Sequence, residues 1–365
     1  MTQALSDAER RDWLRLARTE NVGPVTFDQL IGRFGTAGRA LSGLPDLARR
    51  GGRGAPLKVP TPAEIEDELA AGERLGARLI CACEPDFPQA LAALDPPPPL
   101  IWTRGCAQLL DRSVVAIVGA RVASAAGQRF ARGLASELGG AGLVVASGMA
   151  RGIDAAAHEG ALPSGTIAVL GGGIDDIYPP EHRDLYARIV EAGCVVSESA
   201  PGWRAQARDF PRRNRIISGL ARAVVVVEAE VRSGSLITAR LANEQGREVL
   251  AVPGSPLDPR ARGTNDLIRQ GAALCEGLDD VLRALEGFAG LREPGRGYAG
   301  PPLDALPDDG DLAERVCALL CPTPVSRDEI VRATAAPAPA VFAALVELSL
   351  AGRADLLAGG MVVGR

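Results

Sequence analysis

Residues 210–254 carry the clearest chemical pattern in this chain. An arginine-rich segment leads into an apolar run, Ser233-Gly234-Ser235 follows the run, and a helical pattern begins there with Thr238 in its first turn. Free backbone N–H groups and the positive end of a helix dipole favour a phosphate at such a turn, and small residues let it approach closely. The segment therefore predicts a site for polyphosphate or nucleic acid.

A second turn of the same kind lies upstream. Residues 113–127 read as a buried strand, a turn containing Gly119 and Arg121, and a helix capped near Ser124. Because Arg121 follows a strand end, its guanidinium can form a forked pair of hydrogen bonds with a phosphate. Two such turns in one sheet fit a polymer better than a single small anion.

A third glycine-containing segment is residues 147–158. Gly148 and Gly152 would let the backbone pass close to a ligand, and Asp154 and His158 stand one helical turn apart on the same face. An acid and a histidine at this spacing can act in catalysis. No nucleophile is indicated nearby, however, so capping and turn-fixing hydrogen bonds are the favoured interpretation.

The distribution of charge narrows the choice of ligand. A formal net charge of −5 argues against a uniformly basic nucleic-acid binder and leaves a local basic patch as the footprint. From charge alone, a solvated face or interdomain ion pairs explain such a cluster as well as phosphate contact does, but its position beside the Ser-Gly-Ser turn favours phosphate contact. The cluster consists of Arg204, Arg208, Arg212, Arg213, Arg215 and Arg222, with one acid, Asp209, among them.

The composition excludes several classes of protein. Lys58 is the only lysine, so the chain has no Gly-x-x-x-x-Gly-Lys loop of the P-loop ATPases and kinases. The seven scattered cysteines contain no Cys-x-x-Cys motif, which favours neither a disulfide framework nor zinc. The sequence shows no signal segment and no uninterrupted run of about 18 apolar residues. We therefore expect a cytoplasmic protein without membrane contact, metal or cofactor.

The elements that would position these residues fall into four stretches. Residues 1–75 contain helical patterns and a Gly-Pro turn similar to a helix-hairpin-helix or SAM-like module. Such a module either binds a DNA backbone or serves only as a packing domain. Residues 76–285 alternate apolar strands with helices, which predicts a doubly wound, parallel-sheet (Rossmann-like) α/β domain. Residues 286–310 read as a linker. Residues 311–365 suit a winged-helix module whose helices lack a basic cluster, which favours packing or partner contact over groove reading.

Several sequence blocks in this order resemble the DNA-processing protein DprA (Smf) family. They span roughly residues 112–285, and together they are far more specific than any one glycine turn. The blocks are Gly119-Ala120-Arg121 with Ser124 and Gly127, SGMARGIDAAAH (147–158), TIAVLGGGIDDIYPPEH (166–182), FPRRNRII (210–217), SGSLITA (233–239), VPG (252–254) and GTNDLIRQGA (263–272).

The resemblance implies roles for particular residues. Arg121 matches the family's main phosphate-gripping arginine, Arg183 matches a basic position, and His182 stands where the family usually has Asn. Phe210 would stack on a base or pack beneath the arginines; stacking contributes ~1–3 kcal/mol per base. Because aromatic residues make up only 4% of the chain, affinity should rest on phosphates and fall with salt. The predicted nucleic-acid-binding residues are Gly119, Arg121, Ser124, Gly148, Gly152, Arg183, Arg208, Phe210, Arg213, Asn214, Arg215, Ser233, Gly234, Ser235, Thr238 and Asn265.

The function implied by the resemblance is that of a binding factor rather than an enzyme. Such a protein binds incoming single-stranded DNA in the cytoplasm, protects it, and loads the RecA recombinase during natural transformation and recombination. Family members self-associate through the Rossmann domain, so the resemblance also implies a homodimer. It implies no catalytic residue, no metal and no cofactor.

Two enzyme classes remain as alternatives. Phosphoribohydrolase-like Rossmann enzymes share glycine turns of this kind, but they carry a Pro-Gly-Gly-x-Gly-Thr-x-x-Glu motif with a catalytic acid. The corresponding segment here, residues 233–239, is Ser-Gly-Ser-Leu-Ile-Thr-Ala and lacks that acid. A nicotinamide dehydrogenase is weaker still, because the turn at Gly119 lacks the Gly-x-Gly-x-x-Gly spacing and its arginine would crowd a pyrophosphate.

Overall fold

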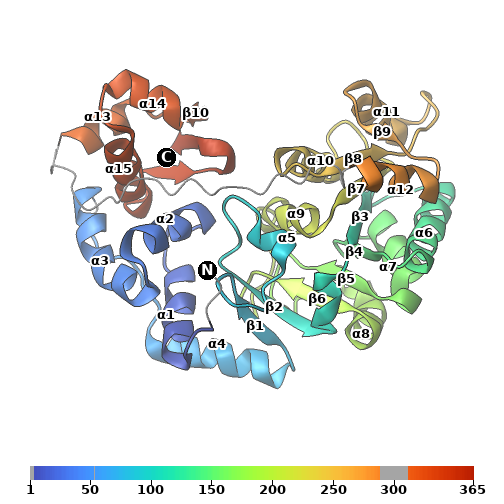
Figure 1. Cartoon of the computed structure of the whole chain (residues 1–365), viewed down its shortest axis with the longest axis horizontal. Coiled ribbons are helices and arrows are strands. Elements are labelled where there is room, and N and C mark those ends of the chain that lie inside the picture. The colour runs from blue at the N-terminus through green and yellow to red at the C-terminus, as the bar shows by residue number, and fades with distance from the viewer. Residues whose placement is uncertain (1–3, 53, 288–310) are drawn as a thin grey trace.

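The computed structural model describes residues 4–52, 54–287 and 311–365, and it has three modules (Figure 1). Most of the predicted linker, from residue 288 to residue 310, lies outside the described residues. Among the described residues no single helix is long and apolar enough to cross a membrane. One pair of helices, bent by 115°, passes such a test only when its two members are taken together.

The N-terminal module consists of four helices: α1 (Asp7–Ala17), α2 (Pro24–Phe34), α3 (Ala37–Arg50) and α4 (Pro62–Arg74). Capping boxes begin α1 and α4, where Ser6 pairs with Glu9 and Thr61 with Glu64. The apolar faces bury Trp13 against Phe27 and continue into the core of the adjoining sheet. The helical patterns predicted for this part of the chain are confirmed.

The central module is built on one nine-stranded sheet. Its strands are β1 (Arg78–Cys81), β2 (Leu100–Gly105), β3 (Val114–Gly119), β4 (Val144–Ser147), β5 (Thr166–Val169), β6 (Cys194–Ser197), β7 (Ala223–Val227), β8 (Glu248–Ala251) and β9 (Ala273–Leu274). The spatial order is β1-β2-β6-β5-β4-β3-β7-β8-β9. From β6 to β9 all neighbours pair in parallel, while β1 and β2 add an antiparallel edge.

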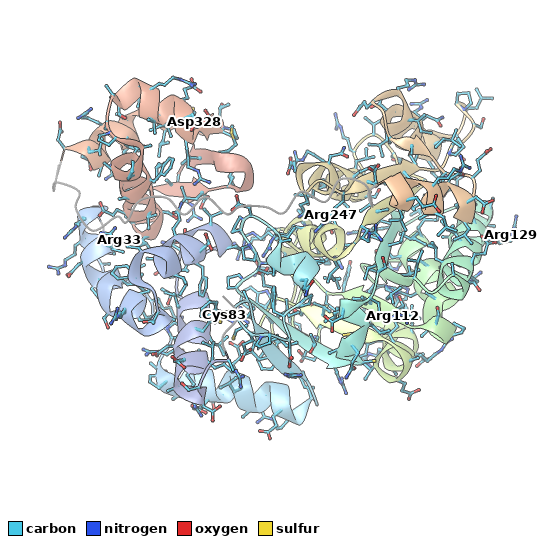
Figure 2. The ribbon with its side chains drawn as sticks, in the orientation of Figure 1. Arg33, Cys83, Arg112, Arg129, Arg247 and Asp328 are labelled. Atoms are coloured by element: carbon cyan, nitrogen blue, oxygen red, sulfur yellow. The ribbon has the colours of Figure 1, made fainter. Side chains whose placement is uncertain are left out.

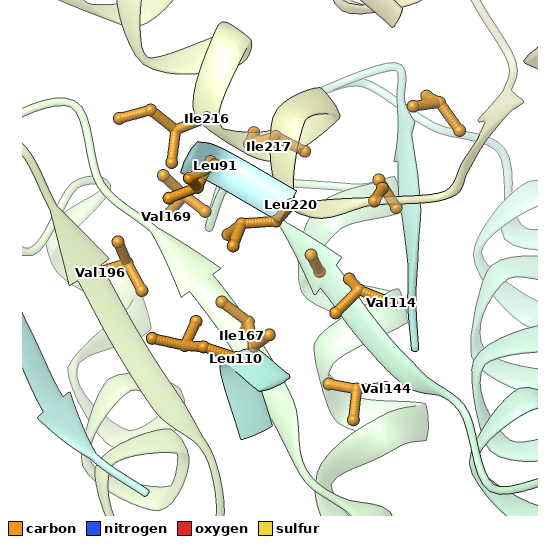
Figure 3. Packing of buried hydrophobic residues seen from close by; sticks show 14 of the residues in the cluster. Leu91, Leu110, Val114, Val144, Ile167, Val169, Val196, Ile216, Ile217 and Leu220 are labelled. Carbon is orange, nitrogen blue, oxygen red and sulfur yellow. The ribbon is translucent and has the colours of Figure 1, made fainter. Parts of the chain in front are cut away.

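Helices cover both faces of this sheet, which explains why its central strands are apolar throughout. On one face α5 and α9 pack on the strands, and Figure 3 shows Leu91, Val169 and Ile216 meeting there. The opposite face is covered by α6, α7 and α12. The helices of the module are α5 (Gln89–Ala92), α6 (Ala125–Gly140), α7 (Ile153–Ala161), α8 (Arg183–Ala192), α9 (Asp209–Leu220), α10 (Gly234–Glu244), α11 (Arg262–Arg269) and α12 (Leu278–Gly287).

The strand order reverses direction between β3 and β7. After β3 the chain adds β4, β5 and β6 on one side, and it then crosses back to place β7, β8 and β9 on the other. Ligands of open α/β sheets bind beyond the strand carboxyl ends at such a switch point. The predicted doubly wound fold is thus confirmed, and it brings the loops after β3 and β7 side by side.

The C-terminal module has the helices and hairpin of a winged helix. It contains α13 (Leu312–Leu319), α14 (Arg327–Thr334) and α15 (Ala338–Leu350), with a sheet of β10 (Val325–Ser326), β12 (Met361–Gly364) and β11 (Ala354–Leu356). The strand β10 was not predicted, and it consists of only two residues. Figure 1 shows α15 lying beside α2 and α3 of the N-terminal module, where Val346 and Leu350 join the N-terminal core.

Candidate nucleic-acid interface

A cavity of about 800 Å³ opens at the switch point between β3 and β7. The loops after these two strands and the first turns of α9 and α10 form its walls. More than half of the predicted binding residues line it: Gly119, Arg121, Phe210, Arg213, Asn214, Ser233, Gly234, Ser235 and Thr238. Because these residues come from three separate segments, only the fold brings them together. We refer to this cavity as the switch-point cavity.

On one wall of the cavity the ring of Phe210 lies close to the cation of Arg121 and to a second ring, that of Tyr178. The guanidinium carbon of Arg121 lies 5.6 Å from the centroid of the Phe210 ring, and the Tyr178 ring centroid lies 5.5 Å from the same centroid. Tyr178 is 50% exposed, and Arg121 is also exposed. The wall therefore offers a π-face and a cation side by side, a combination that suits stacking of an unpaired base next to its phosphate.

The turn that begins α10 is open to this cavity. Ser233 is the N-cap, and its hydroxyl oxygen accepts a hydrogen bond from the N–H of Ser235 at 3.3 Å. Gly234 is exposed, and a Cβ added there would meet nothing within 4 Å. The exposed side chain of Arg232 precedes the turn and also lines the cavity. The positive end of α10 is thus accessible to an anion.

The turn that begins α6 is closed, although its sequence is similar. Ser124 is the N-cap, but its N–H donates to the carboxylate of Glu228 at 2.8 Å, and its hydroxyl donates to the same carboxylate. Glu228 follows β7 and reaches across with a positive φ of 53°. A Cβ added at Gly127 would lie 2.7 Å from this carboxylate. The protein's own anion therefore occupies the place predicted for a phosphate, and Ser124 does not line the cavity.

Arg213 is the most deeply buried of the predicted arginines. It is 7% exposed, and its Nη1 donates to the carbonyl oxygens of Gly148, at 2.7 Å, and Val169. Burial lowers the pKa of its guanidinium to about 10, and the carboxylate of Asp154 opposes that shift. Arg213 therefore stays charged at neutral pH and holds together the ends of β4 and β5 at the cavity floor.

Asp154 fixes the loop beside Arg213. Its Oδ2 accepts hydrogen bonds from the N–H groups of Gly148, at 3.1 Å, and Ala150, at 3.3 Å. Burial raises the pKa of this carboxyl, while Arg213 and the two N–H groups act in the opposite direction. The turn-fixing role predicted for Asp154 is confirmed by these contacts.

The contacts of His158 do not support the catalytic interpretation of Asp154 and His158, which the sequence did not favour. The Nδ1 atom of His158 lies 2.8 Å from the hydroxyl of Thr166, which itself donates to the carbonyl of Val145. Nδ1 must therefore carry the proton, which leaves the buried Nε2 as an acceptor without a partner among the described residues. Burial lowers the pKa of His158 to about 3, so the ring is neutral. These are the properties of a core histidine rather than of a general base.

The two glycines of residues 147–158 serve the protein's own packing. A Cβ at Gly148 would lie 2.7 Å from the Arg213 guanidinium, and one at Gly152 would lie 2.3 Å from the carbonyl oxygen of Ala120. Gly152 also has a φ of +75°, which favours glycine. Neither glycine lines the switch-point cavity, so the predicted close approach is to side chain and backbone of the same chain.

The arginine cluster separates into different environments. Arg204 pairs with Asp176 at 2.9 Å and Arg215 pairs with Glu198, whereas Arg222 donates to the carbonyl of Leu285. Arg208 and Arg212 are exposed, and neither has an acidic partner in the described part of the chain. Ion pairs therefore form in the cluster, but those of Arg204 and Arg215 lie within the central module and not between domains, whereas Arg208 and Arg212 form an open face.

The remaining predicted residues lie outside the switch-point cavity. Arg183 is exposed at the start of α8, after His182, whose Nδ1 lies 2.9 Å from the carbonyl of Met149. The side chain of Asn265 exchanges hydrogen bonds with the backbone of Gly254, at 3.1 and 2.9 Å. It therefore shapes a loop rather than lining this cavity.

Sequence reasoning missed two cavity residues. Tyr178 was assigned no role, although it follows a triple-glycine turn, and Arg232 lies directly before the Ser-Gly-Ser turn. A cation directly before a phosphate-favouring turn is a signal that the sequence did contain. Among the described residues there is no group of three or more His, Cys, Asp or Glu side chains that could hold a metal ion.

Comparison with protein families accounts for most of the chain. The family model described as DNA recombination-mediator protein A matches residues 78–286. Two further models match the flanks: a DprA-like N-terminal HHH domain over residues 7–71 and a DprA winged helix domain over residues 300–360. The three matches follow one another in the order of the three modules.

Individual relatives agree with this assignment. Protein Smf of Escherichia coli is 39% identical over 308 residues, which cover 82% of this chain and 80% of the relative. The crystal structure of DNA processing protein A from Streptococcus pneumoniae superposes with a TM-score of 0.62 at 32% identity, covering 77% of this chain and 98% of that one. The Helicobacter pylori protein, described for its single-stranded DNA binding mode, gives 0.53 at 29% identity and covers 58% and 96%.

Proposed function

This chain belongs to the DprA (Smf) family, and from that premise we propose that it binds single-stranded DNA in the switch-point cavity and loads RecA on it during recombination and natural transformation. The Helicobacter pylori relative is described as binding single-stranded DNA. The one observation that carries the proposal is that the open turn of α10, the cation of Arg121 and the ring of Phe210 line the same cavity.

These three features match the three parts of a nucleotide strand. The helix N-terminus and the guanidinium favour phosphate oxygens, and the ring favours the flat face of a base. A duplex presents phosphates but keeps its bases stacked inside, so it would leave Phe210 without a ligand. We therefore expect a preference for single strands.

The roles of RecA, of a homodimer and of the cytoplasm rest on the family resemblance. RecA assembles on single-stranded DNA, so a protein that delivers this substrate acts where the recombinase is found. A homodimer would place two switch-point cavities on one strand and raise its effective concentration at the second cavity. We propose binding and transfer, with no catalytic residue, metal or cofactor.

The enzyme alternatives find less support in the cavity. A nicotinamide dinucleotide places its pyrophosphate at the helix that follows the first strand of the parallel sheet. Here that strand is β3 and that helix is α6, and the carboxylate of Glu228 occupies the position. The acids that line the switch-point cavity are Asp154, which is tied to a loop, and Glu230. A phosphoribohydrolase-like activity predicts release of base from nucleoside monophosphates, and we expect no turnover.

The test is fluorescence anisotropy of a labelled single-stranded oligonucleotide and its duplex, titrated across a salt series. Arg121→Ala should weaken single-strand binding by roughly 10-fold or more, because a charge-assisted contact contributes about 1.5–3 kcal/mol. The matched control is Arg129→Ala, which removes an exposed arginine on the outer side of α6, where Figure 2 shows it at the edge of the molecule. This control should bind as the wild type does.

Three results would contradict the proposal. Absence of single-strand binding by the wild type at low salt would remove it, and turnover of a nucleoside monophosphate would favour the enzyme alternative. Equal losses in Arg121→Ala and Arg129→Ala would mean that the effect is one of net charge and not of this site. Thermal unfolding of each variant separates lost binding from lost folding.

A further inference from the structure

A second cavity, of about 880 Å³, lies where all three modules meet. The turn between α1 and α2 forms one wall, the first turn of α9 forms another, and the hairpin of β11 and β12 with α15 closes a third side. We refer to it as the three-module cleft. It is adjacent to the switch-point cavity, because Arg213 lines both and the first turn of α9 contributes to both.

The first turn of α9 divides the two spaces. Phe210 and Pro211 line the switch-point cavity, whereas Arg208 and Arg212 line the three-module cleft. A strand whose base stacks on Phe210 therefore has the two exposed guanidinium groups on the other side of the same helical turn. The side chains that line the two cavities therefore alternate along one helical turn.

Six arginines and four acids line the cleft, which leaves a surplus of cations. Arg18 pairs with Glu68 at 2.9 Å, Arg365 pairs with Asp355 at 2.7 Å, and Arg215 pairs with Glu198. No such partner of Arg208 or Arg212 is found in the described ranges. Two buried guanidinium nitrogens that belong to lining residues, Nε of Arg213 and Nη1 of Arg215, also have no hydrogen-bond partner there. An anion in the cleft would compensate these groups.

The opposite wall is the hairpin of the N-terminal module. The helix α2 begins at Pro24 after Gly23, and no side chain caps its first turn. The N–H groups of an uncapped first turn have no intrahelical acceptor, so they favour an anion. Contacts with the C-terminal module fix this wall: Thr26 Oγ1 lies 3.2 Å from Ser349 Oγ, and the side chain of Asn21 donates to the carbonyl of Leu350 at 3.2 Å.

We propose that the three-module cleft is a second binding site, which holds the sugar-phosphate backbone of the single strand as it leaves the switch-point cavity. The strand lies between the hairpin of α1 and α2 and the exposed arginines of α9. The C-terminal module contributes by packing against the hairpin. The inference rests on the proposed function, but it concerns a different set of residues.

Length dependence distinguishes the two sites. In the full chain, Arg212→Ala should leave the affinity for an oligonucleotide of about 5 nucleotides unchanged, because the switch-point cavity suffices for it. The affinity for one of about 20 nucleotides should fall by roughly 5-fold, and the slope of log affinity against log salt should decrease by about 0.7 for the lost phosphate contact. Arg129→Ala is again the matched control and should change neither.

A second pair of variants tests the hairpin of α1 and α2. A Cβ at Gly23 would meet nothing within 4 Å, so Gly23→Asp and Gly23→Asn both fit, and both are good N-caps that should preserve α2. Only the aspartate places a negative charge in the cleft. It should therefore weaken binding of the longer oligonucleotide several-fold relative to the asparagine variant.

The outcomes separate this inference from the proposed function. If Arg212→Ala or Gly23→Asp leaves the affinity for the longer strand unchanged, or lowers the affinity for both lengths equally, the three-module cleft is not a DNA site. In that case Arg121→Ala would still lose binding at both lengths, and the proposed function would stand. If Arg212→Ala abolishes binding of inorganic phosphate but leaves the affinity for the longer strand unchanged, the cleft is a site for free phosphate and the inference is wrong.

Discussion

The N-termini of α6 and α10 have similar local sequences, but the first is closed by a carboxylate of the protein and the second is open to the switch-point cavity. Each follows a strand of the same parallel sheet, and each is capped by a serine, Ser124 or Ser233. At α6 the carboxylate of Glu228 accepts the hydrogen bonds that a phosphate would accept, whereas at α10 Gly234 is exposed and lines the switch-point cavity. A phosphate-favouring turn is therefore a binding site only where the protein does not supply the anion itself.

The closed turn still serves the site, because it fixes the loop that carries Arg121. Glu228 stands at the end of β7 with a positive φ, a conformation that costs of order 1 kcal/mol or more in a residue other than glycine. Its hydrogen bonds with Ser124 join the loop after β3 to the loop after β7. The turn at α6 thus orders the cavity, and the turn at α10 is left free to bind an anion.

The largest expected effect comes from closing the open turn with a carboxylate. Gly234→Glu introduces at α10 the charge that Glu228 supplies at α6, and it should lower single-strand affinity by roughly 10- to 100-fold, or about 1.4–2.8 kcal/mol. A glutamate in a first helical turn favours the helix dipole, so stability should not fall. Fluorescence anisotropy gives the affinity, and thermal unfolding checks the fold.

Gly234→Gln is the control for Gly234→Glu, since it adds nearly the same volume without charge. A Cβ at this position meets nothing within 4 Å, so both side chains fit. Affinities that are equal in the two variants would show that no phosphate lies at the start of α10. The two turns would then not differ in function.

The sequence predicted the architecture because the architecture depends on short-range patterns. Apolar strands alternating with helices require a covered parallel sheet, and the order of the strands places the loops of Gly119 and Ser233 at one edge. Arg121 and Phe210 accordingly line one cavity, as the family resemblance implied. The serine caps at Ser124 and Ser233 were also within reach, since capping is a local property.

Whether each charged side chain is paired or free, buried or exposed, could not be predicted in the same way. Arg212 and Arg213 are neighbours in the sequence, yet one is exposed and the other is 7% exposed beside Asp154, which lies far away in the chain. Likewise Glu228 closes the α6 turn from a different strand, more than 100 residues after Ser124. The composition shows which charged residues the chain contains, but only tertiary contacts decide which of them are neutralised by a partner.

Opening the closed turn should have a smaller effect, which is measured on the stability of the fold. Glu228→Ala leaves the N–H of Ser124 without its acceptor. Because Ser124 is only partly buried, this should lower the free energy of unfolding by about 0.5–1.5 kcal/mol. Sulfate should restore part of that loss by binding at the vacated helix N-terminus. Urea unfolding with sulfate and with chloride at equal ionic strength measures both changes.

Glu230→Ala is the matched control, because it removes an exposed carboxylate from the same loop. Sulfate stabilises most proteins to some degree, so the comparison is the extra gain of Glu228→Ala over the wild type and over this control. If Glu228→Ala gains no more than they do, the α6 turn is not an anion site in the absence of its own carboxylate.

Near neutral pH the smallest expected effect is on the pH dependence of stability. It concerns the face of the sheet that is covered by α6 and α7. The chain has only two histidines, and His158 lies on α7, which packs against α6, while α9 and α10 contain none. Its pKa is lowered from 6.5 to about 3 in the fold, so the unfolded chain binds a proton between these values and the folded chain does not. Stability therefore falls as pH drops below about 6.5, by at most about 1.4 kcal/mol per pH unit.

His158→Asn keeps a donor for the hydroxyl of Thr166 and removes the titrating ring. The slope of unfolding free energy against pH, measured between about pH 4.5 and 7, should be smaller in this variant than in the wild type, whatever its absolute stability. His182→Asn reports the share of the other histidine. An unchanged slope in His158→Asn would mean that the ring binds a proton without unfolding, which its burial and its orphaned Nε2 argue against.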